Sequence, residues 1–92
     1  MSIQWLYEVI HERKAGPTEG SYTSSLFAEG LPKIAQKVGE EASEVIVAAL
    51  AEDDQRLIEE VADLTYHTLV LLAARNISPT HVQTELERRH KK

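Results

Sequence analysis

VGEEASEVIVAAL at residues 38–50 and LIEEVADLTYHTLVLLAA at residues 57–74 join the main acidic clusters of the chain to its most apolar segments. Within them, residues 45–50 and 69–74 are apolar nearly all the way round a helix, which is typical of central, buried helices. A buried carboxylate loses several kcal/mol of solvation unless it is paired or neutralised. Several carboxylates beside such helices therefore indicate a compensating cation.

The length and charge of the chain favour one small domain, residues 1–92. A chain of 92 residues buries a modest share of its surface, and a monomer of this size cannot cover two helices that are apolar all round. We therefore expect a homodimer. The net charge of −5 argues against a general nucleic-acid or anionic-membrane binder, because both need basic surface.

Two further features concern the compartment. The segment MSIQWLYEVIHERK at residues 1–14 lacks the basic start and following apolar run of a signal peptide, and residues 69–74 are too short to span a bilayer. The chain has no cysteine, which excludes disulfides and thiolate metal sites. We expect a soluble, cytoplasmic protein with neither a membrane nor a nucleic acid as partner.

Apolar spacing and turn signals predict an all-α fold, a bundle of four to five helices. Prolines that can open a helix stand at Pro32 and Pro79, Asp53 or Asp54 can cap a helix start, and Asn76 is a plausible stop. The predicted helices cover residues 2–14, about 31–52, 54–75 and about 79–90. The second and third are separated by only a few residues, so they form a central antiparallel hairpin.

The segment AGPTEGSYTSS at residues 15–25 is rich in Gly, Pro, Ser and Thr and is predicted to be the only long loop. Loops of this length are uncommon in compact domains and are often functional. Ser21, Tyr22 and Thr23 are therefore candidate substrate-binding residues. The alternative is a simple surface connector.

Two carboxylate pairs are predicted to face each other across the hairpin. Residues three apart share a helix face, so Glu41 projects with Glu44, and Glu60 projects with Asp63. Glu44 lies nine residues before Asp53 and Glu60 lies seven after it, which puts both pairs at nearly the same height. Four carboxylates at one level form a hard oxygen site for Mg²⁺, with Mn²⁺ as the alternative ion, and not for zinc.

Mg²⁺ in proteins keeps several waters and shares its other positions with substrate phosphates, so a nucleotide polyphosphate is the natural substrate class. The alternative is a solvated acidic helix face with partners four residues away, such as Lys37 with Glu41. Apolar neighbours on the same faces, Val45 and Ala48 among them, imply partial burial and favour the metal site.

The motif EExxE at residues 40–44, followed after residues 45–59 by ExxD at 60–63, resembles the signature of the MazG-like all-α nucleotide pyrophosphohydrolases. The resemblance is closest to the phosphoribosyl-ATP pyrophosphohydrolase family of histidine biosynthesis and covers nearly the whole chain. It is carried by LYEVIHERK at 6–14, GSYTSSLF at 20–27, KIAQKVGEEASEVIVAA at 33–49, EVADLTYHTLVLLA at 60–73 and LERRH at 86–90.

This resemblance implies a MazG-like helical bundle with a dimeric core. It also implies hydrolysis of the α–β phosphoanhydride of 1-(5-phosphoribosyl)-ATP to 1-(5-phosphoribosyl)-AMP and pyrophosphate. By motif position, Glu41, Glu44, Glu60 and Asp63 hold Mg²⁺, and Glu40 is a further ligand or orients the attacking water. The resemblance makes Glu40, Glu41 and Glu44 the catalytic candidates. A separate phosphoribosyl-AMP cyclohydrolase is implied for the next step.

Several other polar residues are candidates for substrate contact. Two lysines precede the acidic cluster on its helix, a basic pair borders the GSYT segment, and an arginine pair in the last helix is a candidate for the ribose phosphate, across the dimer. They are Lys33, Lys37, Arg13, Lys14, Arg88 and Arg89. Such side chains are more often simply solvated. His67, one turn after Asp63, is either a donor behind the metal ligands or a core histidine bonded to a backbone or hydroxyl group.

Two other functions share these features. A housekeeping nucleoside triphosphate pyrophosphatase would use the same metal cluster and differ in base and sugar recognition, and the GSYT segment and LERRH ending favour phosphoribosyl-ATP over it. A non-catalytic helical dimerisation module would instead use the acidic patch to bind a protein partner.

Overall fold

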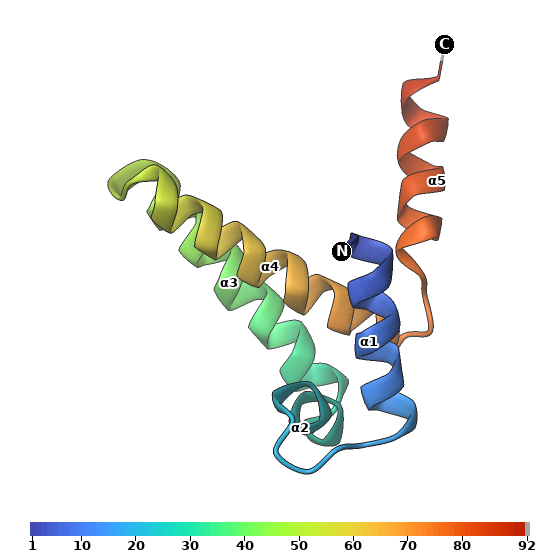
Figure 1. Ribbon diagram of the computed structural model, residues 1–92. Coiled ribbons are helices and arrows are strands. Elements are labelled where there is room, and N and C mark those ends of the chain that lie inside the picture. The colour runs from blue at the N-terminus through green and yellow to red at the C-terminus, as the bar shows by residue number, and fades with distance from the viewer. Residues whose placement is uncertain (92) are drawn as a thin grey trace.

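The computed structural model describes residues 1–91, and within that range its regular structure is entirely helical. The helices are α1 (Ile3–Ala15), α2 (Tyr22–Glu29), α3 (Leu31–Ala51), α4 (Asp54–Ala74) and α5 (Pro79–His90). In Figure 1, α3 and α4 form a long antiparallel hairpin, and α1 and α2 pack near the end where α3 begins and α4 finishes. The predicted all-α bundle with a central hairpin is confirmed.

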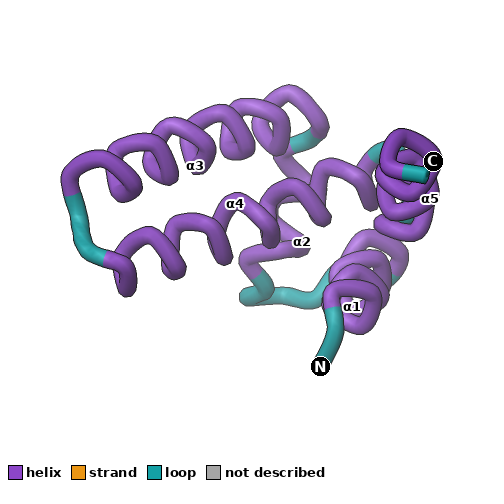
Figure 2. The backbone as a smooth tube through the Cα atoms, turned by 90° about the horizontal axis from the view of Figure 1, so that it is seen from above, coloured by secondary structure: helices purple, strands orange, loops and turns teal. Residues whose placement is uncertain are grey.

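The hairpin follows directly from local sequence signals. Only Glu52 and Asp53 separate α3 from α4, and the Asp53 carboxylate caps α4 by accepting from the Arg56 backbone N–H at 2.9 Å. Pro32 lies in the first turn of α3, where its missing N–H costs nothing. Seen from above in Figure 2, the two helices lie side by side. The helices α1 and α5 lie at the base of the hairpin, the end where α3 begins and α4 finishes, opposite the tip at Glu52 and Asp53.

The hydrophobic core lies at that base. The buried apolar side chains come from α1, α2, the start of α3 and the end of α4, and are Tyr7, Ile10, Leu26, Ile34, Leu69, Val70 and Ala73. This confirms the expected burial of residues 69–74 in large part. The core therefore packs around the base of the hairpin, and among residues 1–91 the tip of the hairpin makes no contact with the core.

The tip of the hairpin is apolar but uncovered in the single chain. Ile46, Val47, Leu50 and Ile58 are between 56% and 84% exposed, and Ala48 is the one residue of 45–50 that is buried. The expectation that residues 45–50 are buried is therefore wrong for one chain taken alone. The reason is that α1 and α2 reach only the base of the hairpin.

The predicted loop at residues 15–25 is wrong in its second half, because residues from Tyr22 onward form α2. The Ser21 hydroxyl caps this helix by accepting from the Ser24 backbone N–H at 3.1 Å, and Leu26 anchors it in the core with 1% of its surface exposed. The Ser- and Thr-rich composition favours a loop, and the short helix forms because it buries Leu26 in the core. Tyr22 and Thr23 therefore lie in its first turn.

Lys14 ties the end of α1 to the end of α4. Its ammonium donates to the Ala73 carbonyl at 3.0 Å and to Asn76 Oδ1 at 2.7 Å. Asn76 has a φ of 57°, the left-handed conformation that often ends a helix, which confirms the predicted stop. The Ala73 carbonyl also accepts from the Asn76 backbone N–H at 3.0 Å, so Lys14 adds a charged donor to a carbonyl at the C-terminal end of α4 and fixes the side chain of Asn76.

The helix α5 begins where predicted, with Ser78 as its N-cap, and packs against α1. It then projects away from the body of the molecule (Figure 1). None of the helices in residues 1–91 combines the length and the apolar character needed to cross a membrane.

Replacing Lys14 with methionine is expected to lower the free energy of unfolding by about 1.5 kcal/mol, because two hydrogen bonds from a charged donor are lost. Urea unfolding at a fixed protein concentration measures this. Lys33→Met is the control, since Lys33 makes no hydrogen bond or ion pair within residues 1–91. Equal stability of the two variants would contradict a capping role for Lys14.

Candidate metal centre

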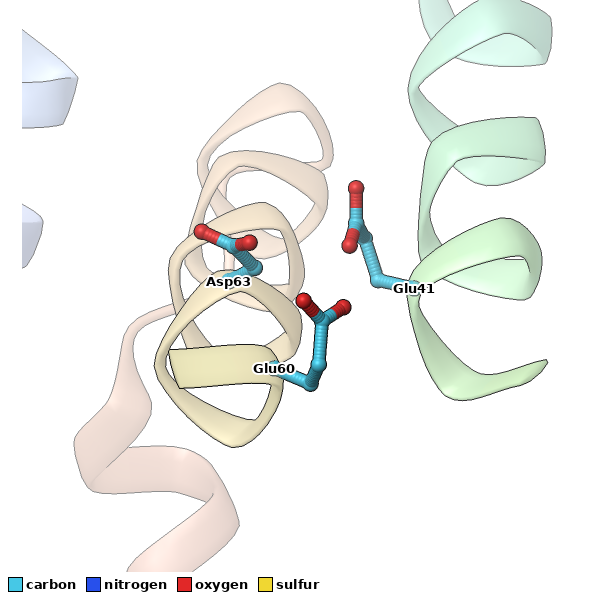
Figure 3. A group of neighbouring side chains, drawn as sticks. All are labelled: Glu41, Glu60 and Asp63. Atoms are coloured by element: carbon cyan, nitrogen blue, oxygen red, sulfur yellow. The ribbon is translucent and has the colours of Figure 1, made fainter. Parts of the chain in front are cut away.

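Three carboxylates from α3 and α4 converge midway along the hairpin. Glu41, Glu60 and Asp63 each offer one oxygen, and these oxygens all lie within 4.8 Å of one another. Figure 3 shows Glu41 reaching from α3 toward Glu60 and Asp63 on α4. The predicted meeting of acidic residues across the hairpin at one level is therefore present.

The burial of two of these carboxylates is what sets the cluster apart. Glu41 is 6% exposed and Glu60 is 5% exposed, although ionised side chains are seldom buried this far. The Oε2 atoms of both have no hydrogen-bond partner within the described residues. An unsatisfied buried charged oxygen is costly, so the site favours a further positive group.

Each buried carboxylate has one cationic neighbour on its own helix. Lys37 Nζ lies 3.6 Å from Glu41 Oε1, and an Arg56 guanidinium nitrogen donates to Glu60 Oε1 at 2.7 Å. These contacts engage only one oxygen of each carboxylate. The free oxygens belong to the two residues that face each other from α3 and α4. Oxygen ligands arranged in this way suit a hard divalent cation.

The other two predicted carboxylates stand at the rim. Glu44 is exposed, and its pKa is raised because it shares a hydrogen bond with Glu41 and feels the negative charge of that residue. Glu40 is exposed as well. It accepts from Gln36 Nε2 at 2.9 Å, and that hydrogen bond is the main reason why its pKa is lowered. Both carboxylates are therefore open to water beside the buried group.

His67 connects the cluster to α2. It is 5% exposed, its Nδ1 lies 2.8 Å from the Asp63 carbonyl oxygen, and its Nε2 lies 2.9 Å from the Tyr22 hydroxyl. It thus has both a backbone partner and a hydroxyl partner, as the core-histidine alternative describes. It also contacts the backbone of Asp63, one of the three converging residues.

The remaining candidates are spread over the molecule. Lys37 borders the cluster, and Lys33 lies one turn earlier on α3. Lys14 is engaged at the end of α4, and Arg88 pairs with Glu85 on α5 through its Nε at 3.0 Å. Arg13 is partly buried near the end of α1. Within one chain the structure does not bring these last three to the carboxylates.

Sequence reasoning missed Arg56. The guanidinium group of this residue donates to Glu60 and also pairs with Glu59 on its other side. The spacing of four residues from Arg56 to Glu60 was a visible signal for an ion pair. The same spacing also links Arg56 to Glu52, so it could not by itself select the buried partner.

The chain matches the family described as Phosphoribosyl-ATP pyrophosphohydrolase over residues 3–90. The chain belongs to the phosphoribosyl-ATP pyrophosphohydrolase family. This match spans every candidate residue, from Arg13 to Arg88.

Curated relatives carry the name phosphoribosyl-ATP pyrophosphatase. One from Listeria welshimeri is 60% identical over 95% of this chain and 84% of its own length. One from Lacticaseibacillus casei is 56% identical over 99% of this chain and 83% of its own. One from Clostridium botulinum (strain Kyoto / Type A2) is 51% identical, over 98% and 82% respectively. The phosphoribosyl-ATP pyrophosphohydrolase resemblance of the sequence is thereby confirmed.

Replacing Glu41 with glutamine is expected to raise the free energy of unfolding in EDTA by about 1 kcal/mol, because it removes a buried charge from a like-charged group. Chemical denaturation measures this change. The matched control is Glu40→Gln, an exposed neighbour, which is expected to shift stability by less than about 0.5 kcal/mol. A Glu41→Gln protein less stable than wild type would show that the carboxylate is well compensated without a metal.

Proposed function

We propose that this member of the family hydrolyses the α–β phosphoanhydride of 1-(5-phosphoribosyl)-ATP, releasing pyrophosphate and 1-(5-phosphoribosyl)-AMP in histidine biosynthesis in the cytoplasm. The family match over residues 3–90 carries the proposal. It is supported by relatives named phosphoribosyl-ATP pyrophosphatase and by the carboxylate cluster within the matched region.

The cluster is proposed to hold Mg²⁺, with Mn²⁺ as the alternative. Glu41, Glu60 and Asp63 would supply oxygen ligands, and Glu44 would join them from the rim. The support is the pair of buried Oε2 atoms without partners, since a divalent cation would satisfy both at once. When bound, such an ion neutralises phosphate charge and polarises the phosphorus under attack.

The chain's own residues then have distinct tasks. A water oxygen adds to phosphorus, the bridging P–O bond breaks toward pyrophosphate, and the water gives up a proton. Glu44 and Glu40 are the exposed carboxylates beside the cluster, so one of them is proposed to orient that water and accept its proton. Glu41 and Glu60, buried with their oxygens facing inward, are suited to binding and not to proton exchange with solvent.

Substrate phosphates are proposed to lie on the side of Lys37. Its ammonium is 3.6 Å from both Glu40 and Glu41, so it borders the cluster without closing it. Lys33 lies one turn away on the same helix and would extend the positive strip. Ser21, Tyr22 and Thr23 at the start of α2 would contact the remainder of the nucleotide.

A homodimer is proposed as the working unit, with residues 1–92 forming one domain in each subunit. The support is the exposed apolar tip of the hairpin, which carries Ile46, Val47, Leu50 and Ile58. A contiguous apolar surface of this kind is usually covered by a partner. In a dimer, the last helix of one chain could approach the cluster of the other, where Arg88 would be placed to bind a phosphate.

The activity is tested by measuring pyrophosphate release from phosphoribosyl-ATP, ATP and a panel of deoxynucleoside triphosphates. We expect selective release from phosphoribosyl-ATP that requires Mg²⁺. Glu41→Gln is expected to lower kcat/KM by at least roughly 100-fold, because loss of metal-based stabilisation costs several kcal/mol. Glu12→Gln, the same change at an exposed position of α1, is the matched control.

The other outcomes each decide between functions. Release only from deoxynucleoside triphosphates would keep the metal centre and overturn the substrate, in favour of a housekeeping pyrophosphatase. No release from any nucleotide would overturn the enzymatic proposal as a whole.

The dimer is tested by size-exclusion chromatography with light scattering, with the protein at about 50 µM. At this concentration a specific dimer with an interface of ordinary size is expected to be associated. Wild type is expected to have twice the mass of the chain. Ile46→Glu is expected to give monomers, because it places a charge in the apolar contact. Thr18→Glu, at an exposed position between α1 and α2, is expected to stay dimeric. A monomeric wild type would contradict the proposal.

A further inference from the structure

Two side-chain pairs join the first turn of α2 to α4. The Tyr22 hydroxyl lies 2.9 Å from His67 Nε2, and the Thr23 hydroxyl pairs with that of Tyr66. The Tyr22 ring also meets the His67 ring nearly edge-on, with centroids 5.9 Å apart and planes at 81°. The start of α2 is thus fastened to α4 within one turn of the carboxylate cluster.

The partners of His67 decide which of its nitrogens carries the proton. Nδ1 lies 2.8 Å from the Asp63 carbonyl oxygen, and a carbonyl can only accept a hydrogen bond. Nδ1 therefore carries the hydrogen, and in the neutral ring Nε2 is left with a lone pair. The Tyr22 hydroxyl must then donate its only hydrogen to Nε2.

The consequence falls on the oxygen of Tyr22. With its hydrogen engaged by His67, this oxygen can offer only lone pairs to another group. Tyr22 as a whole residue is 51% exposed, so much of it is open to solvent at the start of α2. Its partner His67 is bonded to the backbone carbonyl of Asp63, one of the three converging residues, which places the Tyr22 hydroxyl near the cluster. The pKa of Tyr22 is raised, first by desolvation and against the opposing effect of Lys37.

We propose that His67 is a positioning residue that presents the Tyr22 oxygen as a pure hydrogen-bond acceptor, so that Tyr22 selects an O–H or N–H donor of the nucleotide and does not bind phosphate. The inference rests on the proposed pyrophosphohydrolase function and deepens it. Phosphate oxygens at neutral pH are mainly acceptors, and they would find no hydrogen on Tyr22. The phosphates are left to the cationic side of the site.

The tautomer is tested without any activity measurement. In protein labelled with ¹⁵N-histidine and studied by NMR near pH 8, the His67 resonances are assigned by their loss in His67→Gln. We expect Nδ1 to be protonated and Nε2 to be unprotonated, with the Nε2 shift moving in Tyr22→Phe. A proton on Nε2 in wild type would overturn the proposal, whether or not the protein turns over phosphoribosyl-ATP.

Kinetics test the consequence for the substrate. Tyr22→Phe is expected to raise the KM for phosphoribosyl-ATP roughly tenfold, the value of one hydrogen bond, with kcat within about threefold of wild type. Inhibition by inorganic pyrophosphate is expected to stay unchanged, because no phosphate contact is lost. An equal weakening of pyrophosphate inhibition would show that Tyr22 binds phosphate and would overturn the inference.

A double-mutant cycle links the two residues. His67→Leu is expected to raise KM, at most as far as Tyr22→Phe does, because the Tyr22 oxygen remains but its hydrogen is no longer held away from the substrate. The double variant is expected to be no worse than Tyr22→Phe alone. His67→Gln, whose amide oxygen can still accept from Tyr22, is expected to recover most of the loss. Independent, additive effects would overturn the link, and if His67→Leu does not fold, Tyr22→Phe and His67→Gln still decide it.

Tyr66→Phe is the matched control for a merely structural bridge. It removes the other hydroxyl contact between α2 and α4 by the same chemical change. We expect its KM to stay within about twofold of wild type and its effect to add to that of His67→Leu. A Tyr66→Phe variant that behaves like Tyr22→Phe would assign the effect to the anchoring of α2 and not to the acceptor at Tyr22.

Discussion

Two carboxylates on different helices face each other in a nearly dry part of the hairpin, and each keeps an oxygen that no group within residues 1–91 satisfies. This is an arrangement that folding tolerates only with compensation. Lys37 and Arg56 each compensate one oxygen from the same helix as their partner. The two-residue turn then sets the relative height of α3 and α4, so the two carboxylates lie at the same level of the hairpin.

The core, the carboxylates and the exposed apolar residues lie at different positions along the hairpin. The apolar core collects at the base of the hairpin, where Ile10, Leu26, Ile34 and Val70 are almost fully enclosed. The acidic level lies beyond the core, and the uncovered apolar tip lies farther still. The apolar core, the carboxylate cluster and the exposed apolar tip thus occupy successive levels along one pair of helices. A change at one level can therefore leave the others largely intact.

The sequence predicted those parts of the site that depend on local geometry. A period of 3.6 residues and a short turn suffice to bring the pair Glu41 and Glu44 near the height of the pair Glu60 and Asp63. That count, made from Asp53 to Glu44 and Glu60, did not show that Glu41 and not Glu44 joins the buried group. The helix α2 was missed because its Ser and Thr content favours a loop, and only burial of Leu26 reverses that preference. The pairing of Tyr22 with His67 joins positions 45 residues apart, which spacing cannot reveal.

The short turn also bears on the order in which the chain folds. Contacts near Glu52 and Asp53 are close in sequence, and contacts toward the base are progressively farther apart, so loop-closure entropy favours pairing from the tip downward. Pairing in that direction brings the carboxylates of Glu41, Glu60 and Asp63 together first. The apolar side chains of the core at the base are buried only afterwards. A divalent cation bound at the proposed site would then lower the barrier to folding, and a refolding rate that rises with Mg²⁺ is the result expected from that order.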